Sequence, residues 1–580
     1  MARVPERSWM VPARTRDTAL ARTLGLAISL VVLHPSAWSA APVLDHLFPA
    51  AVQAGTSNTL TLVGKSDPWP PKVWSDPPGL TFEPTTNNGV FTVWVGTNAT
   101  PGPRVVRAFN GEGVSAPRFL IVTREPQRAE IEPNGEWSAP QSVDPLPATI
   151  NGRLEKNGDV DSYGIHLEAG QTLVAWMEAY TLMSPLDPVL RLLDSRGVQV
   201  AWNHDDGRSL DPFLAWTAPA PGSYVLQVFG FVYPAGSDIR FAGDARDVYR
   251  LHMTSGPVVR HTVPLGVRRG SHTPLLRRGW NLGADTNQPV TFDGRDLGAG
   301  VEHLPAPPGF GESVLDLLVG DGPERVESEP NSLSAGANPL EIPSAVTGEV
   351  GTPGDEDRFV FHAKKGELLL LEVQSASLGF PLDAWLQVEN SSGKELARND
   401  DASGADPRLE WSAPEDGSYI AAVGNLLQRG GSGAWYRLAL SRATSSLKAT
   451  VAENAFALEP GKTNEIKVNV TRQHGFNAPL TLSVRGLPEG VRAEPGEVPE
   501  KGGECLVRLL AMDAAVPSSG PLQIRVVESG SGPEHVVTMD LVSAGENNGV
   551  PQGYRRLVVE SIAEFWLTVL PAPTKPEEKK

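Results

Sequence analysis

The chain has 580 residues, 40% of them hydrophobic and 20% charged, a composition typical of several globular domains rather than of a disordered chain. Its formal net charge of −18 argues against a nucleic acid or an anionic membrane as partner, because both bind basic surfaces. With 58 glycines and 52 prolines, the composition favours short strands and turns over long helices.

The N-terminus has the pattern of an export signal. Five arginines between Arg3 and Arg22 precede the apolar run LGLAISLVVL at 24–33, and the small residues Ala37 and Ser39 follow. The apolar run is too short to span a bilayer. We therefore expect residues 1–39 to be a signal peptide, the protein to be periplasmic, secreted or cell-surface, and the mature chain to contain no membrane span.

A small unit occurs twice. The stretch at 42–64, PVLDHLFPAAVQAGTSNTLTLVG, matches PVVRHTVPLGVRRGSHTPLLRRG at 257–279. We expect small domains at 40–125 and 257–323. Trp69 and Trp74 lie in a proline-rich stretch of the first, DPWPPKVWSDPPG. Exposed tryptophans there would stack on sugar rings or anchor a protein partner; the alternative is that they cover the end of the domain core.

A larger unit also occurs twice, once after each small one. EIEPN at 130–134 matches ESEPN at 327–331, and GDVDSYGIHLEAGQ at 158–171 matches GDEDRFVFHAKKGE at 354–367. Later stretches match in the same order, through APAPGSYVLQV and APEDGSYIAAV. We expect a duplicated domain at 126–256 and 324–445. Trp216 and Trp411 recur at equivalent positions and are predicted to be core residues.

The remaining chain forms a fifth unit at 446–570 and a solvated tail at 571–580. The lone cysteine, Cys505, lies in the apolar run CLVRLL and is predicted to be a buried strand residue. Short runs rich in β-branched and aromatic residues, bounded by Gly, Pro, Asn or Asp, recur along the whole chain. They predict an all-β protein of tandem β-sandwiches, Ig-like and jelly-roll-like, with no large helical domain.

The larger repeat resembles the bacterial pre-peptidase C-terminal domain. The resemblance rests on E-P-N, then G-D-x-D before an aromatic strand, then P-L-D, an N-D-D turn and G-S-Y, in that order in both copies. It implies a jelly-roll sandwich of a kind appended to secreted proteases and collagenases. The small units resemble Ig-like domains of the IPT/TIG kind, and the assembly resembles exported multidomain proteins of planctomycete-type bacteria.

The acids of these motifs form the candidate metal site. In extended chain, residues i and i+2 point to the same side, so Glu130 and Glu132 share a face, as do Asp159 and Asp161. Oxygen ligands without histidine or cysteine suit Ca²⁺, and the resemblance implies calcium at the equivalent acids of some collagenases. The alternative is that each acid caps a turn through its own backbone. The predicted ligands are Glu130, Glu132, Asn134, Asp159 and Asp161 in the first copy, and Glu327, Glu329, Asn331, Asp355 and Asp357 in the second.

Other shared acids flank turns and are predicted to be structural first, with a second metal site as the alternative: Asp187, Asp205 and Asp206, with Asp383, Asp400 and Asp401.

No catalytic motif accompanies these domains. The chain contains neither H-E-x-x-H nor G-x-S-x-G. We therefore expect a secreted, non-catalytic, multidomain binding or scaffold protein, stabilised by calcium, that contacts an extracellular protein or polysaccharide. The alternative is an accessory or targeting subunit of a secreted peptidase or other hydrolase. The sequence leaves the ligand and the oligomeric state open.

Overall fold

The computed structural model describes residues 40–572, apart from 208, 233–240, 296, 299, 306–313, 403, 495, 530–531 and 543–557. The expected signal peptide at 1–39 and most of the expected tail lie outside these residues. The described chain is nearly all strand, and its helical elements are short 3-10 turns. The predicted all-β fold class is therefore confirmed. None of the described helices is long and apolar enough to cross a membrane.

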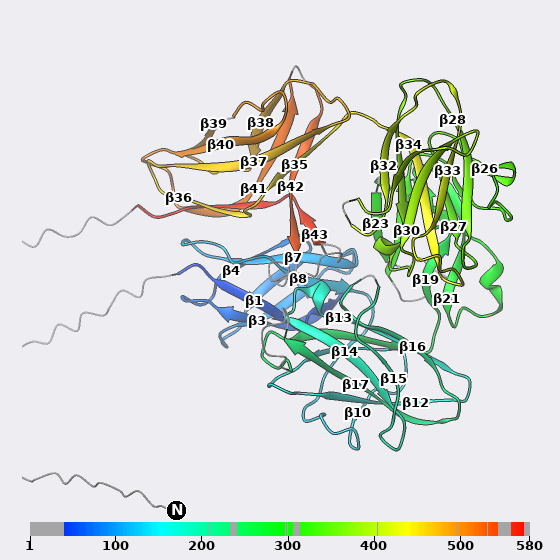
Figure 1. Ribbon diagram of the computed structural model, residues 1–580. Coiled ribbons are helices and arrows are strands. Elements are labelled where there is room, and N and C mark those ends of the chain that lie inside the picture. Colours follow the sequence, from blue (N-terminus) through cyan, green and yellow to red (C-terminus); the bar gives the residue numbers. More distant parts are fainter. Residues whose placement is uncertain are drawn as a thin grey trace, which may run out of the picture. The chain divides into compact units, whose positions relative to one another are not determined.

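The first small sandwich is built from two four-stranded sheets (Figure 1). Its strands are β1 (Val43–Phe48), β2 (Ala51–Gln53), β3 (Ser57–Lys65), β4 (Lys72–Asp76), β5 (Leu80–Pro84), β6 (Val90–Val95), β7 (Gly102–Phe109) and β8 (Arg118–Thr123). The sheet orders are β1-β3-β6-β5 and β2-β8-β7-β4. Alternating residues of both sheets, such as Leu60 on β3 and Leu120 on β8, point inward and are fully buried.

The second small sandwich has two three-stranded sheets. Its elements are β19 (Val258–Val263), β20 (Gly266–Arg268), β21 (His272–Trp280), η2 (Ala284–Asn287), β22 (Val290–Asp293), β23 (Gly300–Pro305) and β24 (Val314–Gly320). The sheet orders are β19-β21-β22 and β20-β24-β23. The first three strands correspond to β1, β2 and β3, as the sequence match implies.

The first large sandwich, which we call the first repeat, consists of two five-stranded sheets. Its elements are β9 (Gln127–Ala129), β10 (Gln141–Ser142), β11 (Ala148–Arg153), β12 (Asp161–Leu167), β13 (Thr172–Glu178), η1 (Tyr180–Leu182), β14 (Leu186–Leu193), β15 (Gln199–Asn203), β16 (Phe213–Thr217), β17 (Gly222–Val232) and β18 (Val248–Thr254). The sheet orders are β10-β12-β17-β14-β15 and β16-β13-β18-β11-β9.

The second large sandwich, the second repeat, has the same topology strand for strand. Its elements are β25 (Glu324–Val326), η3 (Ser334–Gly336), β26 (Asn338–Pro339), β27 (Ser344–Glu349), β28 (Glu356–Ala363), β29 (Leu368–Gln374), η4 (Ala376–Leu378), β30 (Ala384–Asn390), β31 (Glu395–Asn399), β32 (Arg408–Ser412), β33 (Gly417–Asn425) and β34 (Trp435–Arg442). The sheet orders are β26-β28-β33-β30-β31 and β25-β27-β34-β29-β32.

The last sandwich is assembled from a network of paired strands. They are β35 (Ser446–Val451), β36 (Ala455–Leu458), β37 (Thr463–Gln473), β38 (Leu480–Arg485), β39 (Val491–Glu494), β40 (Gly503–Ala511), β41 (Ser518–Glu528), β42 (Glu534–Val542), β43 (Val558–Ile562) and β44 (Phe565–Val569). Cys505 lies on β40 and is 5% exposed, as predicted for a buried strand residue.

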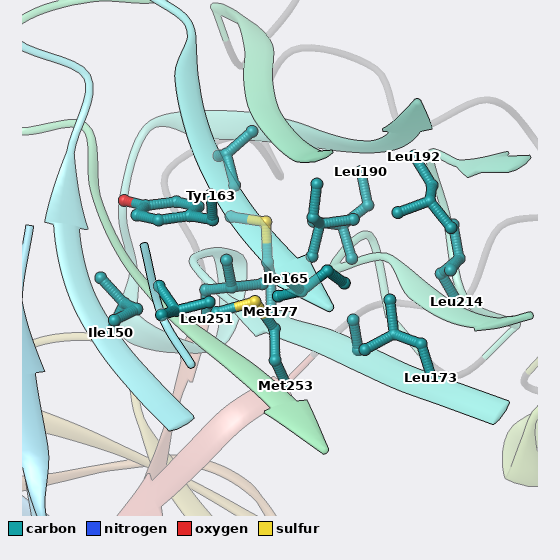
Figure 2. Packing of buried hydrophobic residues seen from close by; sticks show 14 of the residues in the cluster. Ile150, Tyr163, Ile165, Leu173, Met177, Leu190, Leu192, Leu214, Leu251 and Met253 are labelled. Carbon is teal, nitrogen blue, oxygen red and sulfur yellow. The ribbon is translucent and has the colours of Figure 1, made fainter. Parts of the chain in front are cut away.

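The core of the first repeat shows why its sequence forms a sandwich. Inward residues alternate with outward ones on β12 and β14, so that Ile165, Leu190 and Leu192 pack between the sheets (Figure 2). Leu251 and Met253 on β18 meet them from the opposite sheet. Burying a side chain of this size contributes about 1.5–3 kcal/mol. A shift of one residue in strand pairing would turn these side chains toward solvent, so their burial fixes the register of the strands in both sheets.

Candidate functional site

Three carboxylates, which we call the first acidic cluster, meet where the segment after β9 approaches the start of β12. Glu130, Glu132 and Asp161 each offer an oxygen within 4.8 Å of the other two. Glu130 continues the parallel pairing of β9 with β11, since its backbone N donates to Asn151 O at 3.0 Å. Asp161 begins β12 in the facing sheet. The sandwich therefore brings acids from its two sheets together.

Several polar atoms of this cluster are buried without hydrogen-bond partners among the described residues. Asp161 is fully buried and Asn134 is 1% exposed. Oδ1 of Asp161, Oε1 of Glu132 and both amide atoms of Asn134 have no partner. The backbone N of Asn134 donates to Oε2 of Glu132 at 3.1 Å, which keeps the amide beside the acids. An unsatisfied buried polar atom costs about 1–3 kcal/mol, so four in one place indicate a position made for a ligand.

The electrostatics of the cluster favour a cation. Among the described residues, no Lys or Arg side chain forms an ion pair with Glu130, Glu132 or Asp161. Burial raises the pKa of Asp161 to about 9, and the neighbouring carboxylates add to the shift. Burial also raises the pKa of Glu130 to about 8. A positive ion would offset both the desolvation and the repulsion of these acids.

A buried tyrosine orients Asp161. Tyr249 on β18 donates its O–H to Oδ2 of Asp161, and its oxygen lies 2.5 Å from that of Tyr163. Gly152 makes room for this ring, because a Cβ there would lie 2.2 Å from Tyr249 Cζ. The sequence analysis did not identify Tyr249 or Gly152 as supporting residues of the cluster. A signal was present, since the two repeats share Tyr-Arg-Leu at 249–251 and 436–438 and a glycine at 152 and 348.

The second repeat builds the same arrangement, the second acidic cluster. Oxygens of Glu327, Glu329 and Asp357 lie within 4.8 Å of one another. Tyr436 donates to Oδ2 of Asp357 at 2.7 Å, and Nδ2 of Asn331 donates to Oε2 of Glu327 at 3.2 Å. Asn331 and Asp357 are fully buried, and Oδ1 of each lacks a partner. Burial, with mutual repulsion, raises the pKa of Asp357 and of Glu327.

Asp159 and Asp355, also predicted as ligands, have a different role in the structure. Oδ2 of Asp159 accepts from the backbone N of Glu155 at 2.8 Å, and Oδ2 of Asp355 accepts from Gly351 N at 3.0 Å. Both residues lie in the turn before β12 or β28, so the two-residue alternation of a strand does not apply to them. Each of them closes the turn beside its cluster by accepting from the backbone N four residues earlier.

The donor set suits a hard cation of the size of Ca²⁺. Each cluster presents three carboxylates and one amide, with no histidine or cysteine, and calcium takes six to eight oxygen ligands. The buried orphan oxygens in both clusters fit such an ion. Glu130, Glu132, Asn134 and Asp161 would hold it in the first repeat, and Glu327, Glu329, Asn331 and Asp357 in the second.

A further group, Asp187, His204 and Asp205, lies on the first repeat. Its ligand atoms also fall within 4.8 Å, and His204 Nε2 is 3.0 Å from Asp187 Oδ1. All three side chains are partly or largely exposed, and none of their atoms is a buried orphan. The hydrogen bond between His204 and Asp187 connects the residue after β15 to the start of β14, which is a structural role.

Trp69 and Trp74 occupy different environments. The ring of Trp69 lies edge-on to Phe91, with centroids 5.0 Å apart, and Nε1 donates to Thr85 O at 3.3 Å. It packs against the core of the first small sandwich. Trp74 is partly buried on β4. This packing favours the core-covering interpretation of Trp69.

Comparisons with known proteins do not identify a family for this chain. No protein-family model matches the chain, so membership in the pre-peptidase C-terminal family stays a prediction. Over 221 residues the chain is 35% identical to a probable subtilase-type serine protease of Deinococcus radiodurans. The match covers 37% of this chain and 23% of the relative, so it spans less than a quarter of that protein.

Among solved structures, the chain is similar to the N-terminal eight Ig domains of Down Syndrome Cell Adhesion Molecule isoform 1.30.30. The identity is 10% and the TM-score 0.12, with 86% of this chain and 72% of that chain covered. At that TM-score the similarity carries no argument about fold or function.

Proposed function

We propose that the protein is an exported, non-catalytic scaffold whose two large sandwiches each bind one calcium ion, and which contacts an extracellular protein or polysaccharide. The observation that carries the proposal is the pair of acidic clusters, equivalent in both repeats, with fully buried and unpartnered Oδ1 atoms at Asp161 and Asp357. In this proposal the role of each cluster is structural. Its effect is to tie the segment that leads into each sandwich to the first long strand.

Calcium would contribute stability rather than chemistry. An ion that binds the folded state alone stabilises it by RT ln(1 + [L]/Kd), about 2.7 kcal/mol at one hundred times Kd. In its absence each sandwich bears the cost of several buried carboxylates close together. The modules would then be rigid in calcium-rich surroundings outside the cell and looser when calcium is withdrawn.

A thermal melt of the mature chain, in calcium and in chelator, tests the proposal. We expect the midpoint of wild type to rise with free calcium. Asp161→Asn combined with Asp357→Asn should abolish the rise, because each change removes a charge from the cluster while keeping its size. The matched control is Asp159→Asn with Asp355→Asn, which alters acids of the adjoining turns and should retain a rise.

A wild-type chain whose midpoint of thermal unfolding does not change with calcium would contradict the proposal. So would an equal rise in both double variants, since that would place the ion elsewhere.

The second candidate function is an accessory or targeting subunit of a secreted peptidase. The partial match to a subtilase-type protease supports it. The purified chain would then hydrolyse no casein by itself but would bind an exported peptidase from the same organism. Copurification of peptidase activity with the tagged chain would favour this role over an independent scaffold.

A further inference from the structure

One sheet of the first small sandwich carries an exposed tryptophan in the middle of its outer face. β6 lies between β3 and β5 in this sheet. Phe91 and Val93 of β6 are buried in the core, so Thr92 and Trp94, which alternate with them, point outward. Trp94 is 50% exposed. A tryptophan in this position offers a partner a large flat ring that loses little conformational freedom on binding.

The neighbouring strands place polar side chains on both sides of this ring. Ser57 on β3 and Thr81 on β5 are directly opposite Trp94. Residues paired in this way point to the same side of a sheet. The next row on the same side, two residues along each strand, adds three more residues. The Trp94 face, as we call it, consists of Ser57, Thr59, Thr81, Glu83, Thr92 and Trp94.

The hydroxyl groups of the Trp94 face have hydrogen-bonding capacity to spare. Ser57, Thr59 and Thr81 are exposed. In the part of the chain that the structure describes, no side-chain hydrogen bond uses a hydroxyl of this face. By contrast, Thr172 and Thr217, which are paired across two strands of the first repeat, lie with their hydroxyl oxygens 2.8 Å apart. Each hydroxyl of the Trp94 face can therefore donate one hydrogen bond and accept two from a ligand.

The charge of the Trp94 face distinguishes between classes of ligand. Glu83 is the single charged side chain among its six residues, and the whole chain has a net charge of −18. An anionic polymer would be repelled, and a protein surface with charges of both signs would find one charge to pair with. A neutral polysaccharide matches this face, because its hydroxyls can bond to the Ser, Thr and Glu oxygens and the C–H groups of a sugar ring can pack on the indole.

The second small sandwich differs at the same place. β22 pairs with β21 as β6 pairs with β3, and Asp293 is opposite His272 where Trp94 is opposite Ser57. Asp293 forms an ion pair with Arg295, so a charged pair replaces the aromatic ring. The fold therefore forms without a tryptophan at this place, and the stability of the sandwich does not account for Trp94.

We propose that the Trp94 face binds a neutral polysaccharide, with the indole stacked on a sugar ring and the flanking hydroxyls bonded to those of the sugar. This inference rests on the proposed function and names the class of partner that the scaffold contacts. Neighbouring strands lie about 4.8 Å apart, so Ser57 and Thr81 are close enough on either side of the indole to reach the same stacked ring. The outer row then continues the contact along the polymer.

Affinity electrophoresis of the mature chain tests the inference. We expect wild type to be retarded in native gels that contain a neutral polysaccharide, either hydroxyethyl cellulose, xylan or galactomannan, and not in gels that contain anionic alginate. Trp94→Thr should raise the dissociation constant roughly tenfold or more, and Trp94→Phe, which keeps an aromatic ring, should retain part of the binding. The matched control Trp202→Thr changes a tryptophan that is 60% exposed on β15 and should bind as wild type does.

Three results would overturn the inference: free migration of wild type in all the neutral gels, equal retardation by alginate, or retardation that survives in Trp94→Thr. The thermal melt in calcium separates these results from the proposed function. A midpoint that rises with calcium, without retardation by any polysaccharide, leaves the calcium-binding scaffold in place with a protein as its partner. Retardation that depends on Trp94, with a midpoint that does not change with calcium, would support the Trp94 face and contradict the calcium sites alone.

Discussion

Single carboxylates organise whole turns in both repeats. Asp211 is 5% exposed, and its two oxygens accept hydrogen bonds from the backbone N atoms of Ala179, Tyr180 and Thr181 at 2.9, 2.7 and 3.1 Å. Asp406 accepts in the same way from three successive residues, 375–377. These N–H groups lie at the start of the 3-10 turn η1 or η4. One side chain thus satisfies three donors.

Asp211→Ala should therefore destabilise the first repeat strongly. Two buried N–H groups and a third that is partly buried would lose this acceptor, at a cost on the order of 3 kcal/mol. Hydrogen exchange read by mass spectrometry would show faster exchange in peptides that cover 173–182, while peptides of the second repeat stay unchanged. Asp406→Ala provides the reciprocal control. Unchanged exchange at 173–182 would show that other groups hold the turn.

Paired strands carry a buried arginine whose carboxylate partner differs between the repeats. On β18, Arg250 donates to Glu178 Oε2 of β13 at 2.6 Å and to Gln127 Oε1 of β9 at 3.2 Å. On β34, Arg437 donates to Glu324 of β25 and, at 3.1 Å, to Gln374 of β29. The glutamate and the glutamine have exchanged strands. Each sandwich keeps one carboxylate and one amide around its arginine.

This exchange predicts a rescue by a second substitution. Glu178→Gln leaves Arg250 without a carboxylate and should cost about 3–5 kcal/mol, the usual penalty for breaking a buried pair. Gln127→Glu in the same chain copies the arrangement of the second repeat and should restore most of the loss. A double-mutant cycle by chemical denaturation measures the coupling. Additive effects of the two substitutions would contradict it.

The ion pair between Glu178 and Arg250 makes the stability of the first repeat depend on pH. Burial alone would raise the pKa of Glu178, but Arg250 and His252 outweigh it and hold the pKa at about 2, against 4.5 for the free side chain. Because the folded pKa is lowered, the stabilisation is present above pH 4.5 and is lost as pH falls toward 2. Exchange in peptides of β13 should accelerate across that window in wild type. Glu178→Gln should lack this part of the pH dependence.

At the scale of the whole molecule, duplication provides two separate copies of one site. Each acidic cluster belongs to its own sandwich, with a hydrophobic core of its own. The two sites therefore share no ligand residue. Their occupancy by calcium should be additive and independent.

Calorimetric titration of the chelator-treated mature chain should accordingly detect two calcium ions per chain. Glu132→Gln should remove one of them and Glu329→Gln the other, because each substitution affects a single cluster. The double variant should bind neither. Loss of both ions from one substitution would show that the repeats are coupled, and would contradict the independence argued here.

Much of the architecture follows from the sequence alone. The duplicated motifs, the density of turns and the alternation of apolar residues determined an all-β chain of sandwiches, because strand period and turn chemistry are local properties. The burial of Cys505 followed from its apolar run in the same way. The acids at Glu130 and Glu132 were found for the same reason, since their spacing on one extended segment sets them on one side.

Only the tertiary structure decided which residues meet across the sandwich. Tyr249 contacts Asp161 from 88 positions away in the chain, and no local sequence pattern predicts that contact. Asp159 accepts a hydrogen bond from Glu155 N in the turn before β12, and β12 begins two residues later at Asp161, so the alternation of one strand does not relate these two acids. Trp202 is 60% exposed, because it lies on the solvent face of an edge strand. Exposure depends on which strands lie beside a residue, and long-range pairing alone determines that.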